Sequence, residues 1–264
     1  MAFVSPDQSA EIVLNITTLP TKIRAGRPVD GAQIAKLPSA ARSSLITVTL
    51  VNSRFMWRST DLITGRIQLF RSTPGVGTPV LGCYTDSALV PASVIAKGTV
   101  KTLRLFAQGG DTVLKLPKGS ILARCSGAVK GYSTVFSLVS RGAKKGSLII
   151  ATNNGKFVMA SPRIDPKMLR IKIGVVPRVG GQQPTVAILG VRSRVPVLQL
   201  LDGNKKWRDI TLPRIGAGST FGGIVAVRIA GRTYLVLQVV AKDRSTTYRS
   251  VLVPEEMLRQ AKSN

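Results

Sequence analysis

Apolar and polar residues alternate along much of the chain with a period of two. In residues 168–175, Leu, Ile and Val occupy every second position from Leu169 on, and Arg170 and Lys172 lie between them. Residues 46–50 and 63–69 show the same alternation. A period of two is typical of a half-buried β-strand, because successive side chains point to opposite faces. These segments therefore predict strands with one apolar and one polar face.

Other segments are apolar on both faces and predict central strands. Residues 147–150 and 234–240 are of this kind. Asn154-Gly155 lies between residues 147–152 and 156–161 and suits a type I′ hairpin turn, which requires positive φ angles. Further hairpin candidates are Gly109-Gly110, Asp202-Gly203 and Ala230-Gly231. Many short strands about ten residues apart are typical of all-β folds, and we expect an antiparallel β-sandwich or a jelly-roll-like fold.

Little of the sequence predicts helix. Residues 254–262 begin with Pro and two acids and end with basic residues, which favours a short C-terminal helix. Residues 29–42 suggest a second, short helical turn before Pro38. Segments 141–146 and 161–167 combine Gly or Pro with charge, as linkers do.

We expect two β-rich blocks. The first is an N-terminal β-sandwich domain over residues 1–160, and the second is a C-terminal β-rich domain over residues 161–264 that carries the terminal helix. A single continuous system of sheets is the alternative. No convincing internal repeat relates the two halves.

The net charge of the chain indicates that this β protein has an anionic partner. The 264 residues include 38 Lys and Arg against 12 Asp and Glu, a formal net charge of +26, and 44% are hydrophobic. The hydrophobic content supports a folded core rather than disorder. Such an excess of like charge opposes compaction unless an anionic partner neutralises it. The expected partner is RNA or an anionic membrane surface, and charge alone does not separate the two.

The basic residues expected to contact the polyanion are distributed over the whole body, whereas residues 1–21 contain no Lys or Arg. The candidate polyanion-binding residues are Arg66, Lys115, Lys118, Arg124, Arg141, Lys144, Lys145, Arg170, Lys172, Arg192, Arg194, Lys205, Lys206, Arg208 and Arg228. Aromatic residues make up only 5% of the chain, so base-specific recognition is not expected. Trp57 and Trp207 have basic neighbours and are interpreted as partly buried rings.

Catalytic and cofactor chemistry find little support. The chain has no His, which excludes Ser-His-Asp triads and imidazole zinc sites. The glycine-rich segments 75–77 and 216–223 lack the patterns of phosphate-binding loops and are interpreted as turns. The twelve acids form no recognisable motif. We therefore expect no enzyme, no catalytic residue, no cofactor, no metal site and no small-molecule substrate.

The two cysteines and the first twenty residues bear on localisation. Cys83 and Cys125 are too few and too far apart for a disulfide framework or a thiolate metal cluster, and Cys125 is interpreted as a buried free thiol, which fits a reducing compartment. Residues 1–20 lack the basic and apolar regions of a signal peptide, and no run of about 18 apolar residues predicts a membrane span. The expected localisation is a virion or the host cytoplasm.

These features together favour a non-enzymatic viral structural protein of coat or matrix type. It would self-associate into an oligomer or shell and bind a polyanion without sequence specificity. The alternative is a plant-virus cell-to-cell movement protein of the thirty-kilodalton superfamily that binds single-stranded RNA. A third class, a ribosomal or other cellular RNA-binding protein, would carry a denser basic composition than the 19% charged residues here.

Overall fold

The fold is built from antiparallel strands in short, sequential sheets. The computed structural model describes residues 2–4, 11–13, 27–36, 43–61, 67–80, 83–85, 88–126, 133–142, 145–178, 183–229, 231–243 and 246–259. These residues belong to two compact units. Unit 1 contains residues 1–13, 140–149 and 160–264, and unit 2 contains residues 14–139 and 150–159.

Unit 2 contains the first two four-stranded sheets and most of a third. The first sheet is formed by β3 (Arg27–Lys36), β4 (Ser43–Val51), β5 (Arg54–Asp61) and β6 (Ile67–Pro74). The second has the order β7 (Thr78–Val80), β10 (Ala92–Lys97), β11 (Val100–Ala107) and β12 (Gly110–Lys115). The third is formed by β13 (Ser120–Cys125), β14 (Thr134–Ser140), β15 (Ser147–Asn153) and β16 (Lys156–Ala160). A small hairpin of β8 (Tyr84–Thr85) and β9 (Ala88–Leu89) lies between β7 and β10 in the chain.

Unit 1 contains the last two large sheets and the helix. The fourth sheet is formed by β17 (Met168–Val176), β18 (Thr185–Arg192), β19 (Val195–Leu201) and β20 (Trp207–Ile210). The fifth is formed by β21 (Thr220–Ile229), β22 (Arg232–Val240) and β23 (Thr246–Val253), and α1 (Glu255–Leu258) follows it. The short strands β1 (Ala2–Val4) and β2 (Glu11–Val13) pair with each other.

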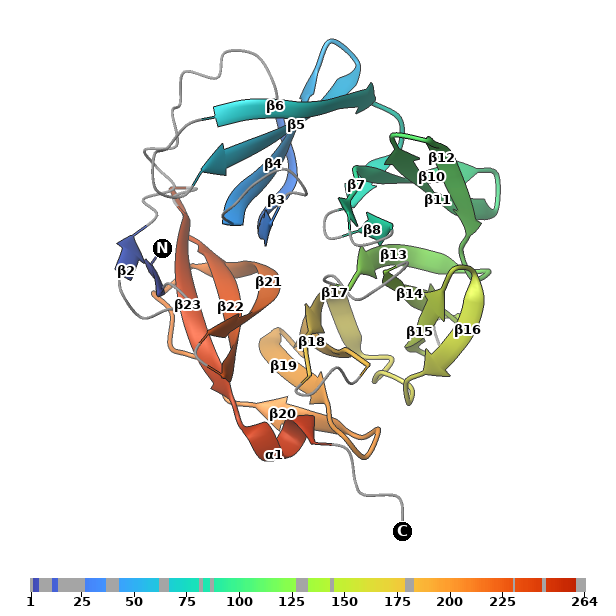
Figure 1. The fold of residues 1–264 in the computed structure, drawn as a ribbon. Coiled ribbons are helices and arrows are strands. Elements are labelled where there is room, and N and C mark those ends of the chain that lie inside the picture. Colours follow the sequence, from blue (N-terminus) through green and yellow to red (C-terminus); the bar gives the residue numbers. More distant parts are fainter. Residues whose placement is uncertain are drawn as a thin grey trace. The chain divides into compact units, whose positions relative to one another are not determined.

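The topology of these sheets corrects the expected fold class. In each large sheet the strands pair in chain order as an antiparallel meander, as Figure 1 shows for β17 to β20, and in the second sheet the β8–β9 hairpin is inserted between the paired strands β7 and β10. Five such sheets in succession are the topology of a five-bladed β-propeller. The prediction of an all-β antiparallel protein is confirmed, and the β-sandwich and jelly-roll predictions are wrong. A period of two reports that a strand has a buried face, but not whether that face packs in a sandwich or in a blade.

Local predictions had mixed outcomes. The Asn154-Gly155 turn is confirmed, since it connects β15 to β16 and both residues have positive φ angles, 46° and 75°. The C-terminal helix is confirmed over Glu255–Leu258 with both acids in its first turn, and residues 260–262 lie outside the described residues. The helical turn predicted within residues 29–42 is wrong over its described part, because β3 pairs there with β4 and this pairing supplies the backbone hydrogen bonds.

The main core of unit 2 contains a disulfide bond. Cys83, which follows β7, bonds to Cys125 at the end of β13, and both side chains lie in a cluster with Leu103, Leu105 and Val135. The prediction of a free thiol at Cys125 is therefore wrong, and the two cysteines no longer support a reducing compartment. The sequence separation of 42 residues concealed the pair, because only the packing of β7 beside β13 brings the two segments together.

A second core in unit 1 holds the fourth and fifth sheets against each other. Buried Leu189 and Leu198 come from the fourth sheet, and buried Leu235 and Leu237 come from the fifth. Leu258 of α1 is also buried in this cluster. The shared core fixes β17 and β18 beside β21, and these strands form the walls of the site described below. Among the described residues, no helix is long and apolar enough to cross a membrane.

Candidate functional site

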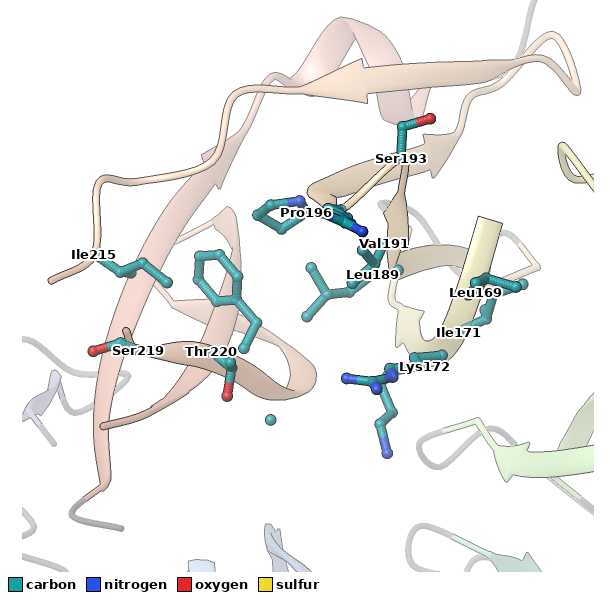
Figure 2. Close-up of a pocket in the computed structure, with 15 residues that line it drawn as sticks. Leu169, Ile171, Lys172, Leu189, Val191, Ser193, Pro196, Ile215, Ser219 and Thr220 are labelled. Atoms are coloured by element: carbon teal, nitrogen blue, oxygen red, sulfur yellow. The ribbon is translucent and has the colours of Figure 1, made fainter. Parts of the chain in front are cut away.

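A groove of ≈ 970 Å³ lies in unit 1 between the fourth sheet and the start of β21. We call it the cationic groove. Its lining residues are Leu169, Arg170, Ile171, Lys172, Leu189, Gly190, Val191, Ser193, Arg194, Pro196, Ile215, Ser219, Thr220, Phe221 and Gly222. Figure 2 shows Leu169, Ile171 and Lys172 on one side of the open space and Ile215, Ser219 and Thr220 on the other. The volume lies within the range of pockets that bind small ligands.

A β-bulge shapes the wall formed by β17. Leu169 pairs with Val191 and Lys172 pairs with Leu189, so two residues of β17, Arg170 and Ile171, oppose the single residue Gly190 of β18. Arg170 has a φ angle of +53°, a left-handed conformation that non-glycine residues seldom adopt. A bulge interrupts the alternation of faces and redirects side chains. The strand predicted over residues 168–175 is thus confirmed, but its single apolar face is not.

The bulge explains why Leu169 lies on the surface. Its side chain is 63% exposed, whereas Met168 and Ile173 are buried. Simple alternation had placed Leu169 and Ile173 on the same buried face. The extra residue in the bulge places them on different faces, and it leaves Arg170 and Lys172 exposed at the groove.

The third cation at the groove comes from the turn between β18 and β19. Ser193 and Arg194 have φ angles of 50° and 67°, which are the signs that a type I′ hairpin turn requires at its two central positions. Asn and Gly usually occupy these positions, because other residues are strained there. Strained residues cluster at functional sites. Arg170 and Arg194 are both strained, and both line the cationic groove.

The three rim cations, Arg170, Lys172 and Arg194, have no acidic partner among the residues that the structure describes. None of the described groove-lining residues is acidic, and no described acid forms an ion pair with a rim cation. The floor between them is largely aliphatic, with Leu189 buried and Phe221 half-buried. An apolar floor lowers the local dielectric, which strengthens the attraction of the rim for an anion.

Glycine at position 190 is necessary for the bulge. A Cβ atom on Gly190 would lie 2.7 Å from Met168 Cγ and 3.1 Å from the Leu169 carbonyl oxygen. We expect Gly190→Ala to lower the free energy of unfolding by about 1–3 kcal/mol, the usual cost of overpacking. Urea denaturation measures this loss. Gly109→Ala is the matched control, since a Cβ atom there meets nothing within 4 Å. Equal stabilities for the two variants would contradict the account of the bulge.

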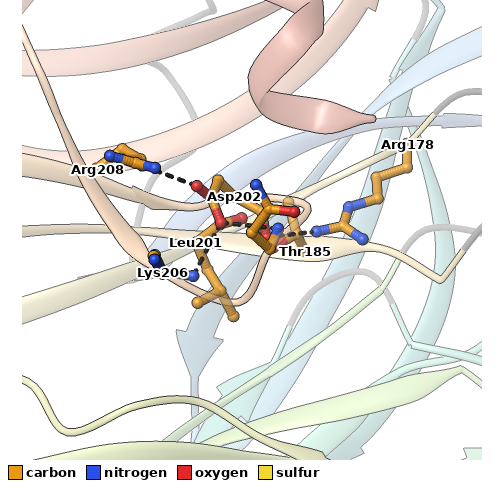
Figure 3. A network of polar contacts seen from close by, with 7 residues as sticks. Arg178, Thr185, Leu201, Asp202, Lys206 and Arg208 are labelled. Carbon is orange, nitrogen blue, oxygen red and sulfur yellow. Dashed lines mark hydrogen bonds and ion pairs between the residues drawn. The ribbon is translucent and has the colours of Figure 1, made fainter. Parts of the chain in front are cut away.

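A second basic segment is the hairpin between β19 and β20, which carries Lys205, Lys206 and Arg208. Asp202 organises it, as Figure 3 shows. The backbone N–H groups of Asn204 and Lys206 each donate to Asp202 Oδ1 at 2.8 Å, and Arg208 Nε donates to Asp202 Oδ2 at 2.8 Å. The side chain of Asp202 is 7% exposed. Arg208 therefore has a structural partner, whereas Lys205 and Lys206 are exposed.

The same contacts set the ionisation of Asp202. Burial by itself raises the pKa of this carboxyl group, but the hydrogen bonds from Arg208, Lys206 and Asn204 outweigh burial and hold the pKa below its ordinary value of 3.8. A carboxyl group whose pKa falls on folding stabilises the fold above its unfolded-state pKa. That stabilisation is lost as the pH falls through the lower, folded-state pKa.

We expect Asp202→Asn to lower the free energy of unfolding by about 2 kcal/mol at pH 7, because charge-assisted hydrogen bonds are lost from a buried group. The difference between wild type and variant should shrink as the pH falls from the ordinary pKa of 3.8 through the lower folded-state pKa, where the folded wild-type carboxyl group becomes protonated. Urea denaturation between pH 7 and pH 2.5 measures both effects. Asp209→Asn, an exposed acid of the same hairpin, is the control. A difference that does not depend on pH would contradict this role.

The remaining candidate residues have different surroundings in the structure. Arg192 forms an ion pair with Asp165 at 3.5 Å, and Arg124 is half-buried with Nη1 3.4 Å from the Ala123 carbonyl oxygen. Lys115, Lys118, Arg141 and Lys145 are exposed in other parts of the two units. Arg66 and Lys144 lie outside the described residues, as does the side chain of Arg228. Of the predicted residues, Arg170, Lys172 and Arg194 are those brought together at the groove.

Sequence reasoning missed the apolar part of the groove. Pro196, Ile215 and Phe221 carry no motif, and the sequence of segment 216–223 predicts only a turn. A turn is present at Gly216–Ser219, and β21 begins directly after it. Trp57 is 1% exposed and donates to Thr73 Oγ1, so it offers no surface for stacking. Across the described residues, no three His, Cys, Asp or Glu side chains gather as metal ligands.

No protein-family model matches the chain, and no curated protein matches it. The geometry and charge of the site are therefore the basis for assigning a function.

Proposed function

We propose that the chain is a non-enzymatic viral structural protein of coat or matrix type, which self-associates and binds a polyanion through its basic residues. The polyanion is RNA or an acidic membrane surface, and recognition is independent of sequence. The viral assignment depends on the combination of an all-β body, a net charge of +26 and the absence of His from the sequence.

The observation that carries polyanion binding is the cationic groove. Arg170, Lys172 and Arg194 line one concave surface without a described acid to neutralise them. Two of the three have strained backbones that hold them at the rim. Isolated surface cations would not share one concave surface.

Exposed edge strands support self-association. β12 and β16 are edge strands of the second and third sheets, and they expose Val113 (59%) and Phe157 (68%). Unpaired edges that carry apolar side chains readily pair with another chain. Lateral pairing of such edges would assemble copies into a layer or shell.

We expect Val113→Lys combined with Phe157→Lys to weaken self-association at least tenfold, because charged residues on an edge block pairing. Analytical ultracentrifugation measures the association constant. The stability of a single copy should change little, since both side chains are exposed. Val76→Lys is the control, because Val76 is similarly exposed but lies between β6 and β7. Unchanged assembly by the double variant would remove these edges from the proposal.

The proposed function is tested by titrating the full chain with single-stranded RNA and with acidic vesicles at 50 mM and 200 mM salt. Electrostatic binding should weaken strongly at the higher salt concentration, because each counterion released from the anion gains less entropy in more concentrated salt and the charges are screened. Failure to bind either probe at low salt would overturn the proposal.

A further inference from the structure

We propose that the cationic groove binds the acyl chain of an acidic lipid, with the head group held by Arg170, Lys172 and Arg194. This inference rests on the proposed function and selects one of its two polyanions. It assigns different roles to the apolar floor and to the charged rim.

The lining of the groove matches an acyl chain better than nucleotide bases. Single-stranded nucleic acids bind proteins by stacking their bases on aromatic side chains. The aromatic residue among the described lining residues is Phe221, which is half-buried, whereas Leu189, Pro196 and Ile215 are aliphatic. A flexible hydrocarbon needs no stacking surface and is stabilised by the burial of apolar area alone.

The rim of the groove has the composition of a membrane-contacting surface. Leu169, a groove-lining residue, is 63% exposed next to Arg170. Val195 is 60% exposed and lies between the groove-lining residues Arg194 and Pro196 in the chain, although it does not line the groove itself. Exposed aliphatic residues beside cations insert into the head-group region of an anionic bilayer, where the cations contact the phosphates. Bound RNA would gain nothing from these two aliphatic side chains.

The proposal is tested at 150 mM salt by calorimetry on the full chain with three probes, each kept below the concentration at which it aggregates. They are monomeric oleoyl-lysophosphatidic acid, glycerol 3-phosphate, which has the head group alone, and monooleoylglycerol, which has the chain without the charge. We expect the lysophosphatidic acid to bind at least tenfold more tightly than either of the others, because it occupies both the floor and the rim.

Two matched variants separate the groove from the rest of the surface. Ile215→Trp fills the groove and should weaken lysophosphatidic acid binding at least tenfold, with little effect on glycerol 3-phosphate. Val225→Trp is the control, since Val225 is exposed on β21 and is not among the groove-lining residues. Circular dichroism checks that both variants fold.

The outcomes distinguish this inference from the proposed function. Equal affinities for lysophosphatidic acid and glycerol 3-phosphate, or equal effects of the two Trp variants, would overturn the inference even if acidic vesicles bind. Binding of single-stranded RNA that Ile215→Trp weakens, without binding of the lysolipid, would assign the groove to RNA and also overturn it. If the chain binds neither RNA nor acidic vesicles, both proposals are overturned.

Discussion

The triple variant Arg170→Gly, Lys172→Gln and Arg194→Gly is expected to bind acidic vesicles about a hundredfold more weakly than the wild type at low salt. Each cation near an anionic membrane contributes about 1 kcal/mol, and three together correspond to about two powers of ten in affinity. Vesicle co-sedimentation with phosphatidylglycerol at 50 mM salt measures the change. The difference should decrease at 200 mM salt, where screening reduces the contribution of each charge.

Fold integrity and net charge are controlled separately in this experiment. Glycine adopts positive φ without strain, so Arg170→Gly and Arg194→Gly should not weaken the bulge or the turn. A second triple variant, Lys97→Gln, Lys156→Gln and Arg232→Gln, removes three exposed cations that are not among the groove-lining residues. Equal losses in the two variants would show that only the total charge matters.

Removal of the disulfide bond should have the largest effect on stability. The bond between Cys83 and Cys125 closes a loop with a sequence separation of 42 residues. Loop-closure entropy for a loop of this length corresponds to about 4 kcal/mol of stabilisation. We expect Cys83→Ala with Cys125→Ala to lower the free energy of unfolding of unit 2 by about this amount.

The measurement is urea denaturation followed by the fluorescence of Trp57, which is 1% exposed in the first sheet of the same unit. Trp207→Phe in both proteins removes the other tryptophan signal. Reduction of the wild type should reproduce most of the effect of the double variant. A midpoint that neither reduction nor substitution shifts would contradict the role of the disulfide bond.

Strand positions were predictable because they depend on local patterns. The segments around residues 46–50, 168–175 and 234–240 all lie in strands, and Asn154-Gly155 forms the turn that its φ preferences predicted. The bulge was not predictable, because it depends on Gly190 in the partner strand and on the space that Met168 occupies. A pattern within one strand carries no information about its partner.

The candidate site was predictable only in part. Sequence reasoning named Arg170, Lys172 and Arg194, but as members of a set of fifteen basic residues. Other members of the set are not free to bind an anion in the same way, since Arg192 and Arg208 form ion pairs with acids. Apolar Ile215 and Phe221 had no local signal, because an apolar residue that lines a groove resembles one in a core.

The sequence by itself determined that the protein is rich in strands, strongly basic and without imidazole chemistry, since these properties depend on composition and on neighbours in the chain. Only the tertiary structure decided that the sheets are successive meanders, that Cys83 bonds to Cys125, and that three cations share one apolar groove. Each of these features joins residues that are distant in the chain or on different strands. Their proximity depends on pairing and packing, which no local pattern encodes.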